Sequence, residues 1–163
     1  YKNILMKSFF KELKPKYKVS FLEEKKPLGT AGVLYKLKNK NKTFFITNCD
    51  VVLDLNYNDL AKFHENKNFD ITIVVSLQKD RIPYGVCKVY NDQLQNIKEK
   101  PEKNYLANTG FYVVNSKVFG LIKKNENTSF VDLINKALSK KMKIGIFPIS
   151  SDGWLDLGQS VNL

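Results

Sequence analysis

Residues 43–52 read TFFITNCDVV, and this stretch decides the fold class. Residues 44–47 are aromatic or β-branched, which predicts a β-strand. The run is short and almost wholly apolar, as is typical of a strand covered on both faces in a parallel sheet. It then breaks into Asn48, Cys49 and Asp50. In open α/β sheets ligands gather at the carboxyl ends of strands, so Asp50 is a candidate Mg²⁺ ligand, and the alternative is a turn or helix-capping Asp.

The segments around this stretch alternate between helical and extended patterns. Residues 3–14 place Met6, Phe10 and Leu13 on one apolar face, which predicts a helix that Pro15 ends. The other elements expected up to residue 77 are a strand over 17–23, a helix of about ten residues from Thr30, a helix over 60–65 and a strand over 70–77. This order predicts an α/β domain with a parallel sheet and crossover helices.

After residue 77 the predicted strands become shorter. Residues 84–90 and 94–98 flank an Asn91-Asp92 turn, which predicts a hairpin. Residues 106–114 predict a strand with Gly110 in its interior, where a glycine marks either a close approach or a β-bulge. The last predicted elements are helices over 116–124 and 129–140 and a strand over 143–149. We find no internal repeat and no linker, so residues 1–163 are interpreted as one domain.

Composition excludes several classes of protein. With 163 residues, of which 43% are hydrophobic, the chain can bury a core and is not a disordered segment. No apolar run approaches the roughly 20 residues of a membrane span. The net charge is +11, but the lysines are scattered and Arg81 is the only arginine. We therefore interpret the charge as solvated lysine faces that favour anionic small substrates, and we disfavour nucleic acid as a partner.

The residues most often used in catalysis are scarce. Cys49 and Cys87 have no metal-site spacing, which predicts free thiols in a reduced cytoplasm and hence a cytoplasmic protein. His64 is the only histidine and lies in a polar helical stretch. We therefore predict that it is a surface residue and a poor candidate for a catalytic base.

Two glycine-containing segments are candidate binding loops. In PLGTAG, residues 27–32, a strand turns through proline and glycine into a helix start, where unpaired backbone N–H groups can bind a ligand. The alternative is an ordinary turn with a helix cap. In GWLDLG, residues 153–158, the isolated acid Asp156 is either a second ligand or a turn-forming residue.

These motifs follow one another in the order PLGTAG, NCD, YGV, EKP, NTGFYV and WLDLGQ. In that order the chain resembles the sugar-1-phosphate nucleotidylyltransferases, or NDP-sugar pyrophosphorylases, and most of all their guanylyltransferase-like branch. The resemblance implies a Rossmann-like nucleotidyltransferase domain with a mixed central sheet flanked by helices. It also implies Mg²⁺-dependent transfer of a nucleotidyl group from an NTP to a sugar 1-phosphate, for surface-glycan or nucleotide-sugar biosynthesis. A homo-oligomer is compatible with this assignment.

The same resemblance implies roles for individual residues. Asp50 and Asp156 match the Mg²⁺ ligands and, with Lys100, which matches the contact to the sugar phosphate, form the implied catalytic set. Leu28, Gly29 and Thr30 match the turn under the nucleotide. The implied sugar contacts are Gly85, Glu99, Asn108, Thr109 and Gly110. The residue-level alternatives are a surface charge pair for Glu99 and Lys100, and a β-bulge for Gly85 and Gly110.

Glu24 lies five residues before Gly29, where thymidylyl and uridylyl relatives carry a base-reading glutamine. An ionised glutamate only accepts hydrogen bonds, and guanine offers two adjacent donors, N1–H and its exocyclic amine. Glu24 therefore predicts GTP as the favoured NTP. The alternative is a solvated side chain beside Lys25 and Lys26.

One departure from the family pattern is large. The family opens with a strand and a loop of the form GxGTRLxPxTxxxPK, which holds the triphosphate, and no such stretch is present. Together with the start on Tyr1, this predicts a fragment that lacks roughly the first βαβ units and is inactive by itself. The alternative function is a non-catalytic relative that binds a nucleotide or a sugar phosphate.

Overall fold

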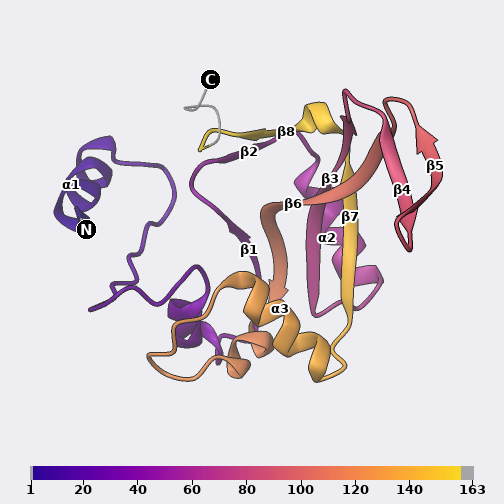
Figure 1. The fold of residues 1–163 in the computed structure, drawn as a ribbon. Coiled ribbons are helices and arrows are strands. Elements are labelled where there is room, and N and C mark those ends of the chain that lie inside the picture. The colour runs from indigo at the N-terminus through magenta and orange to yellow at the C-terminus, as the bar shows by residue number, and fades with distance from the viewer. Residues whose placement is uncertain (1, 159–163) are drawn as a thin grey trace.

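Four strands form the main sheet of the computed structural model, which describes residues 2–158. In spatial order they are β1 (Thr43–Thr47), β6 (Glu102–Asn115), β3 (Ile71–Arg81) and β7 (Ile144–Ile149). β6 is antiparallel to β1 and β3, whereas β3 and β7 are parallel, so the sheet is mixed (Figure 1). The predicted mixed α/β fold is confirmed. The expectation that the first strands pair directly in parallel is wrong, because β6 lies between β1 and β3.

β6 is an inner strand of the sheet. Its successive apolar residues point to opposite faces of the sheet, and both faces are covered by a hydrophobic core. Tyr112 and Val114 face a core formed with α3 (Phe130–Ser139) and two 3₁₀ helices, η1 (Gly32–Leu37) and η2 (Ser116–Leu121). Phe111 and Val113 face a second core, covered by α2 (Tyr57–Asn66) and by the strand pair β2 (Val51–Leu53) and β8 (Trp154–Asp156). Each such side chain contributes about 1.5–3 kcal/mol when fully buried.

β1 is an edge strand with one covered face. Phe44 and Ile46 pack against the first core, whereas Phe45 is 48% exposed. The prediction of a strand covered on both faces is therefore wrong. The layer of α2, β2 and β8 lies over β3 and β6, and on this face the Phe45 ring packs beside the rings of Tyr57 and Phe111.

The N-terminal segment stands apart from the sheet in Figure 1. Its helix α1 (Asn3–Leu13) agrees with the prediction, and it contacts the following segment through the Lys7–Glu23 ion pair and the Phe10–Phe21 ring contact. The strand predicted over 17–23 is absent, since this segment pairs with no strand of the described chain. The helix predicted from Thr30 is the shorter 3₁₀ helix η1.

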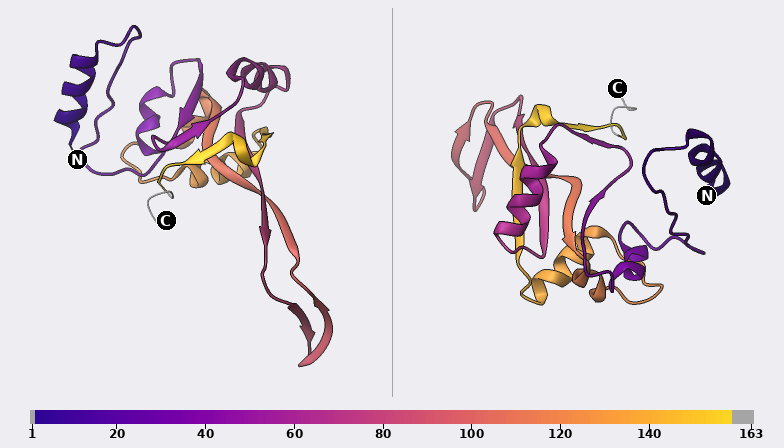
Figure 2. Two further views of the ribbon diagram at one scale, coloured as in Figure 1. Left: turned by 90° about the horizontal axis from the view of Figure 1, so that it is seen from above. Right: turned by 180° about the vertical axis from the view of Figure 1, so that it is seen from behind.

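The predicted hairpin is confirmed as β4 (Val86–Tyr90) and β5 (Gln93–Lys98). Asn91 and Asp92 have φ values of 46° and 60°, which agrees with the two-residue turn that fits the strand twist. Figure 2 shows the hairpin at the far end of the β3–β6 ribbon, projecting from the body of the domain. Every residue of both its strands is exposed.

His64 is the clearest single-residue correction. It is 2% exposed, and its Nδ1 atom lies 2.8 Å from the Thr72 hydroxyl of β3, while Nε2 lies 3.4 Å from Asn115 Oδ1 of β6. The prediction of a surface residue is wrong because it relied on the polar neighbours of His64 in the sequence, whereas His64 itself lies on the buried face of α2. Both cysteines are free, as predicted, and both are exposed. In the described part of the chain, no helix has the length and apolar character needed to cross a membrane.

Candidate functional site

Asp50 and Asp156 come together through the pairing of β2 with β8. Val51 is opposite Asp156 in this antiparallel pair, and the Leu157 backbone N–H donates to the Asp50 carbonyl at 2.9 Å. The position that a Cβ would take at Gly158 is 2.9 Å from Asp50 Oδ2 and 3.2 Å from Asp156 Oδ1. The two carboxylates therefore lie close together beside Gly158, whose backbone N–H donates to Asp156 Oδ1 at 2.9 Å.

This arrangement fits one hard divalent cation. Mg²⁺ in phosphate chemistry takes one or two protein carboxylates and completes its shell with water and substrate phosphates. Both acids are partly exposed, so the remaining coordination positions can face a substrate. Among residues 2–158, no group of three or more His, Cys, Asp or Glu side chains could hold a metal ion. The site thus offers the two carboxylates that the family resemblance implies.

The wall beside this pair is a β-bulge in β6. The register with β3 shifts between Ile73 and Val75, and Gly110 has a φ of +80°, a conformation that glycine adopts at no steric cost. The Thr109 hydroxyl is buried and donates to the Val74 carbonyl at 2.9 Å. Asn108 donates to the Tyr112 hydroxyl at 2.8 Å. Thr109 is therefore part of the sheet core, and Asn108 bonds along its own strand.

Leu28, Gly29 and Thr30 are held by a loop that the sequence did not connect with them. The Thr128 N–H donates to the Leu28 carbonyl at 2.9 Å, and the Thr30 hydroxyl accepts from the Phe130 N–H at 2.9 Å. Gly29 has a φ of +77°, and a Cβ there would lie 2.6 Å from the Thr128 carbonyl oxygen. The glycine is thus required by the close approach of this loop.

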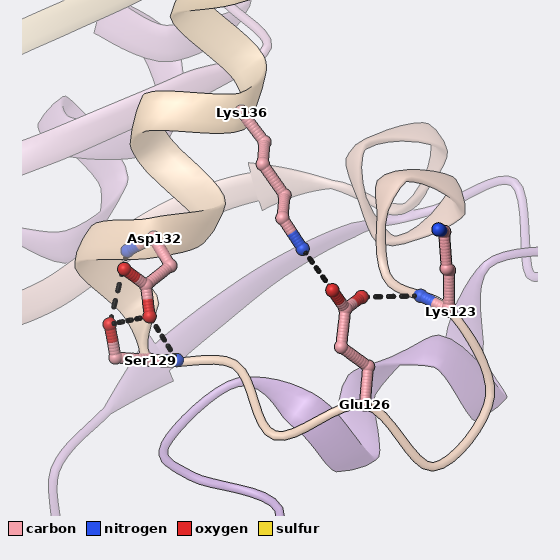
Figure 3. Close-up of polar contacts among 5 residues, drawn as sticks. All are labelled: Lys123, Glu126, Ser129, Asp132 and Lys136. Carbon is pink, nitrogen blue, oxygen red and sulfur yellow. Dashed lines mark hydrogen bonds and ion pairs between the residues drawn. The ribbon is translucent and has the colours of Figure 1, made fainter.

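That loop, residues 123–129, is itself fixed by two carboxylates (Figure 3). Glu126 accepts from the Lys136 ammonium at 2.8 Å and from the Lys123 N–H at 2.9 Å, and these bonds lower the pKa of its carboxyl. Asp132 and Ser129 form a capping box at the start of α3, which lowers the pKa of the Asp132 carboxyl. α3 therefore supports the turn that contains Gly29.

Glu24 lies in a groove of ≈ 400 Å³. Leu28 and Tyr35 give this groove an apolar part, while Lys25, Lys26 and Lys124 line it with positive charge. The neighbouring Glu23 is tied to Lys7 and, through its carbonyl, to Lys36. The lining therefore combines apolar side chains with charges of both signs.

The remaining predicted residues form a second group on the hairpin. The Cβ position of Gly85 lies 3.1 Å from Glu99 Oε2, and the Lys100 N–H donates to the Tyr84 carbonyl at 3.2 Å. Lys100 has a φ of 42°, which is uncommon for a residue with a side chain. Gly85, Glu99 and Lys100 are thus close together, but their hairpin lies away from β2 and β8 (Figure 2).

Sequence reasoning missed Asn48, Thr128 and Gly158 as residues that shape these sites. Gly158 stood inside a quoted motif, and its place beside Asp156 was a usable signal. The contacts of Asn48 and Thr128 depend on residues far away in the sequence, for which no local signal exists. Gln159, the last residue of the WLDLGQ motif, lies outside the described residues.

The mixed α/β fold of this chain is similar to the folds of solved nucleotidyltransferase structures. The chain matches HddC from Yersinia pseudotuberculosis with a TM-score of 0.67 and 21% identity, over 96% of this chain and 68% of that chain. It matches a putative glucose-1-phosphate thymidylyltransferase from Bacillus anthracis with a TM-score of 0.64 and 21% identity, over 98% of this chain and 70% of that one. At these identities the likeness shows the fold. HddC has also been solved in complex with GMP-PN.

The family model for nucleotidyl transferases matches residues 2–163, and the chain belongs to this family. It is 30% identical to mannose-1-phosphate guanyltransferase beta-A of Xenopus laevis over 150 residues, which cover 87% of this chain and 41% of the relative. It is 31% identical to a mannose-1-phosphate guanyltransferase of Aspergillus oryzae over 171 residues, which cover 98% of this chain and 46% of the relative. The chain thus spans less than half the length of these curated relatives.

Proposed function

We propose that this chain carries the metal-binding part of an enzyme that transfers a nucleotidyl group, with GTP favoured, to a sugar 1-phosphate. A phosphate oxygen of the sugar 1-phosphate forms a bond to the α-phosphorus of the NTP, and the bond to pyrophosphate breaks. The products are an NDP-sugar and pyrophosphate. The observation that carries the proposal is the convergence of Asp50 and Asp156 on the space beside Gly158.

The two carboxylates have a defined task in this reaction. Asp50 and Asp156 would hold Mg²⁺, which when bound neutralises the phosphates and aligns them for in-line attack. The bond from the Leu157 N–H to the Asp50 carbonyl keeps the two acids in register, and a side chain at residue 158 would crowd both carboxylates. Positioning and charge stabilisation are the main contributions a protein makes to such a transfer.

The other two groups of residues would bind the two substrates. Glu24 would accept the N1–H and the exocyclic amine of guanine, above the turn formed by Leu28, Gly29 and Thr30. Lys100 would pair with the phosphate of the sugar 1-phosphate, while Glu99, Gly85 and the segment Asn108-Thr109-Gly110 would line the sugar. The relatives in the nucleotidyl transferase family make mannose 1-phosphate the first sugar to test.

The proposal is tested by two measurements. Protein expressed from the complete reading frame is assayed for pyrophosphate release with GTP, UTP and dTTP against a panel of sugar 1-phosphates. We expect the highest rate with GTP. Mn²⁺, a spectroscopic substitute for Mg²⁺, is titrated into the 163-residue chain and followed by water-proton relaxation, and we expect one site that Asp50→Asn abolishes.

Asp54→Asn is the matched control, because Asp54 is an exposed acid that follows the same strand β2. Mn²⁺ binding without any nucleotidyl transfer would support the non-catalytic relative instead. Unchanged Mn²⁺ binding in Asp50→Asn would overturn the metal site.

A further inference from the structure

One residue of the 123–129 loop holds both ends of the turn that contains Gly29. The Thr128 N–H donates to the Leu28 carbonyl at 2.9 Å, and the Thr128 carbonyl accepts the Ala31 N–H at 3.0 Å. Thr128 is 1% exposed, so both bonds are shielded from water. The path of the turn backbone is therefore set by a segment from a distant part of the chain.

Gly32, which follows this turn, allows the two segments to approach. A Cβ at Gly32 would lie 2.6 Å from the Glu126 carbonyl oxygen and 2.6 Å from the Leu28 Cβ atom. Both distances are far inside van der Waals contact. Rotating a side chain moves neither atom, because one belongs to the backbone and the other is bonded directly to it. A side chain at residue 32 must therefore shift the backbone of the loop, the backbone of the turn, or both.

The loop is the more firmly held of these two segments. The Glu126 carboxylate accepts from the Lys136 ammonium and from the Lys123 N–H (Figure 3), and the loop leads into α3 through a capping box. The turn, by contrast, is exposed at Gly29 and Thr30. Crowding at Gly32 is therefore expected to distort the turn more than the loop, and to weaken the two bonds that join them.

We propose that Gly32, Glu126 and Thr128 are positioning residues for the nucleotide, an inference that rests on the proposed function. Glu126 fixes the loop, Thr128 joins the loop to the turn, and Gly32 leaves the space that this junction needs. Together they set the backbone shape with which residues 28–30 lie under the NTP. All three act through the backbone of the turn, without touching a substrate themselves.

Gly32→Ala tests the inference in two forms of the protein. In the enzyme expressed from the complete reading frame, we expect the KM for GTP to rise about tenfold or more, because a shift of about 1 Å in a positioning element is enough for such a loss. The KM for mannose 1-phosphate should change little. In the 163-residue chain, the Ala31 and Thr128 amides should exchange their hydrogens faster, since they donate the two bonds between turn and loop.

Gly120→Ala is the matched control, because a Cβ at Gly120 meets nothing within 4 Å. Neither Gly32 nor Gly120 has a positive φ, so a strained backbone contributes to neither variant. The control should leave both KM values and both exchange rates unchanged. A KM for GTP that stays native in Gly32→Ala, or rises no more than the KM for mannose 1-phosphate, would overturn the inference.

Failure of the proposed function is distinguishable from failure of this inference. If the native enzyme transfers no nucleotidyl group from any NTP, the proposed function fails, and the two exchange rates decide whether Gly32 fixes the turn.

A second variant serves if Gly32→Ala does not fold. Glu126→Ala removes both bonds of the carboxylate at a partly exposed position, so the Thr128 amide should exchange faster and the KM for GTP should rise. Glu126→Gln keeps an acceptor for the Lys123 N–H and should lie closer to the native protein. Slow Thr128 exchange and a native KM for GTP in Glu126→Ala would overturn the inference.

Discussion

The predicted site residues lie in two regions that are supported very differently. Asp50 and Asp156 flank the β2–β8 pair, whose residues Val51, Leu53 and Trp154 pack into the second core. Gly85, Glu99 and Lys100 flank a hairpin with no buried residue in either strand. A two-stranded hairpin is marginally stable by itself in water. The comparison teaches that core packing supports the position of the carboxylate pair, whereas the hairpin residues have no such support.

The largest effect is expected in the supported region. Asp156→Asn removes a carboxylate from the proposed metal site, so turnover of the enzyme expressed from the complete reading frame should fall about a thousandfold or more. Asp152→Asn changes an exposed acid close by and is the control. Pyrophosphate release and circular dichroism are measured together, and near-normal turnover in folded Asp156→Asn would remove this residue from the site.

A smaller effect is expected on the hairpin. Lys100→Ala removes the ammonium that is proposed to pair with the sugar phosphate, so the KM for the sugar 1-phosphate should rise about ten- to a hundredfold while the KM for the NTP changes little. Lys88→Ala, an exposed lysine on the same hairpin, is the matched control. If the loss falls equally on the NTP, Lys100 does not belong to the sugar side, and the two regions do not divide the substrates as proposed.

Specificity for the base should shift less. Glu24→Gln replaces a side chain that only accepts hydrogen bonds by one that also donates them. The preference for GTP over UTP should therefore fall about tenfold. This factor corresponds to the low end of the free-energy cost of leaving one buried hydrogen-bonding group without a partner. Glu23→Gln makes the same charge change in the same groove, but Glu23 is paired with Lys7. The ratio of kcat/KM values is measured for both. An unchanged ratio in Glu24→Gln would leave Glu24 as a solvated side chain.

The smallest effect concerns stability and not chemistry. Burial lowers the pKa of the His64 imidazole below the value of about 6.5 that it has in the unfolded chain. The unfolded chain therefore binds the proton first as the pH falls, so stability is complete above about pH 6.5 and is lost progressively toward the folded-state pKa. Hydrogen bonds lower the pKa values of the Glu126 and Asp132 carboxyls below their usual range near pH 4. The stability that these two carboxyls contribute is therefore lost only at a pH below the range in which His64 titrates.

Urea unfolding at about pH 7.5 and pH 5 measures this effect, and His64→Gln provides the comparison. The variant should lose about 1 kcal/mol at the higher pH through the missing bond to Thr72, and its stability should depend less on pH. His64 is the only histidine, so a pH dependence that persists unchanged in the variant would contradict the assignment.

Local sequence patterns predicted most elements of the fold. The α1 helix, the Asn91-Asp92 hairpin, the amphipathic helix α3 and the strands β3, β6 and β7 follow from periodicity and turn residues, which act over a few positions. The same patterns failed for residues 17–23, which have strand-like residues but pair with no strand among residues 2–158. They predicted the strand β1 but not its exposed face, because whether a strand lies at the edge of a sheet depends on which other segments of the chain pack beside it.

For the site, the sequence by itself determined which residue types stand in which motifs, and the motif order indicated the family. Only the tertiary structure decided which of these residues meet. Asp50 and Asp156 share a space because the β2–β8 register places Val51 opposite Asp156, and Lys100 stands apart because its hairpin projects from the sheet. Gly110 lies against the Asn48 side chain and Gly29 against the Thr128 backbone, although each pair is far apart in the sequence. Such contacts arise from strand pairing and packing between remote parts of the chain, for which the local order of residues carries no signal.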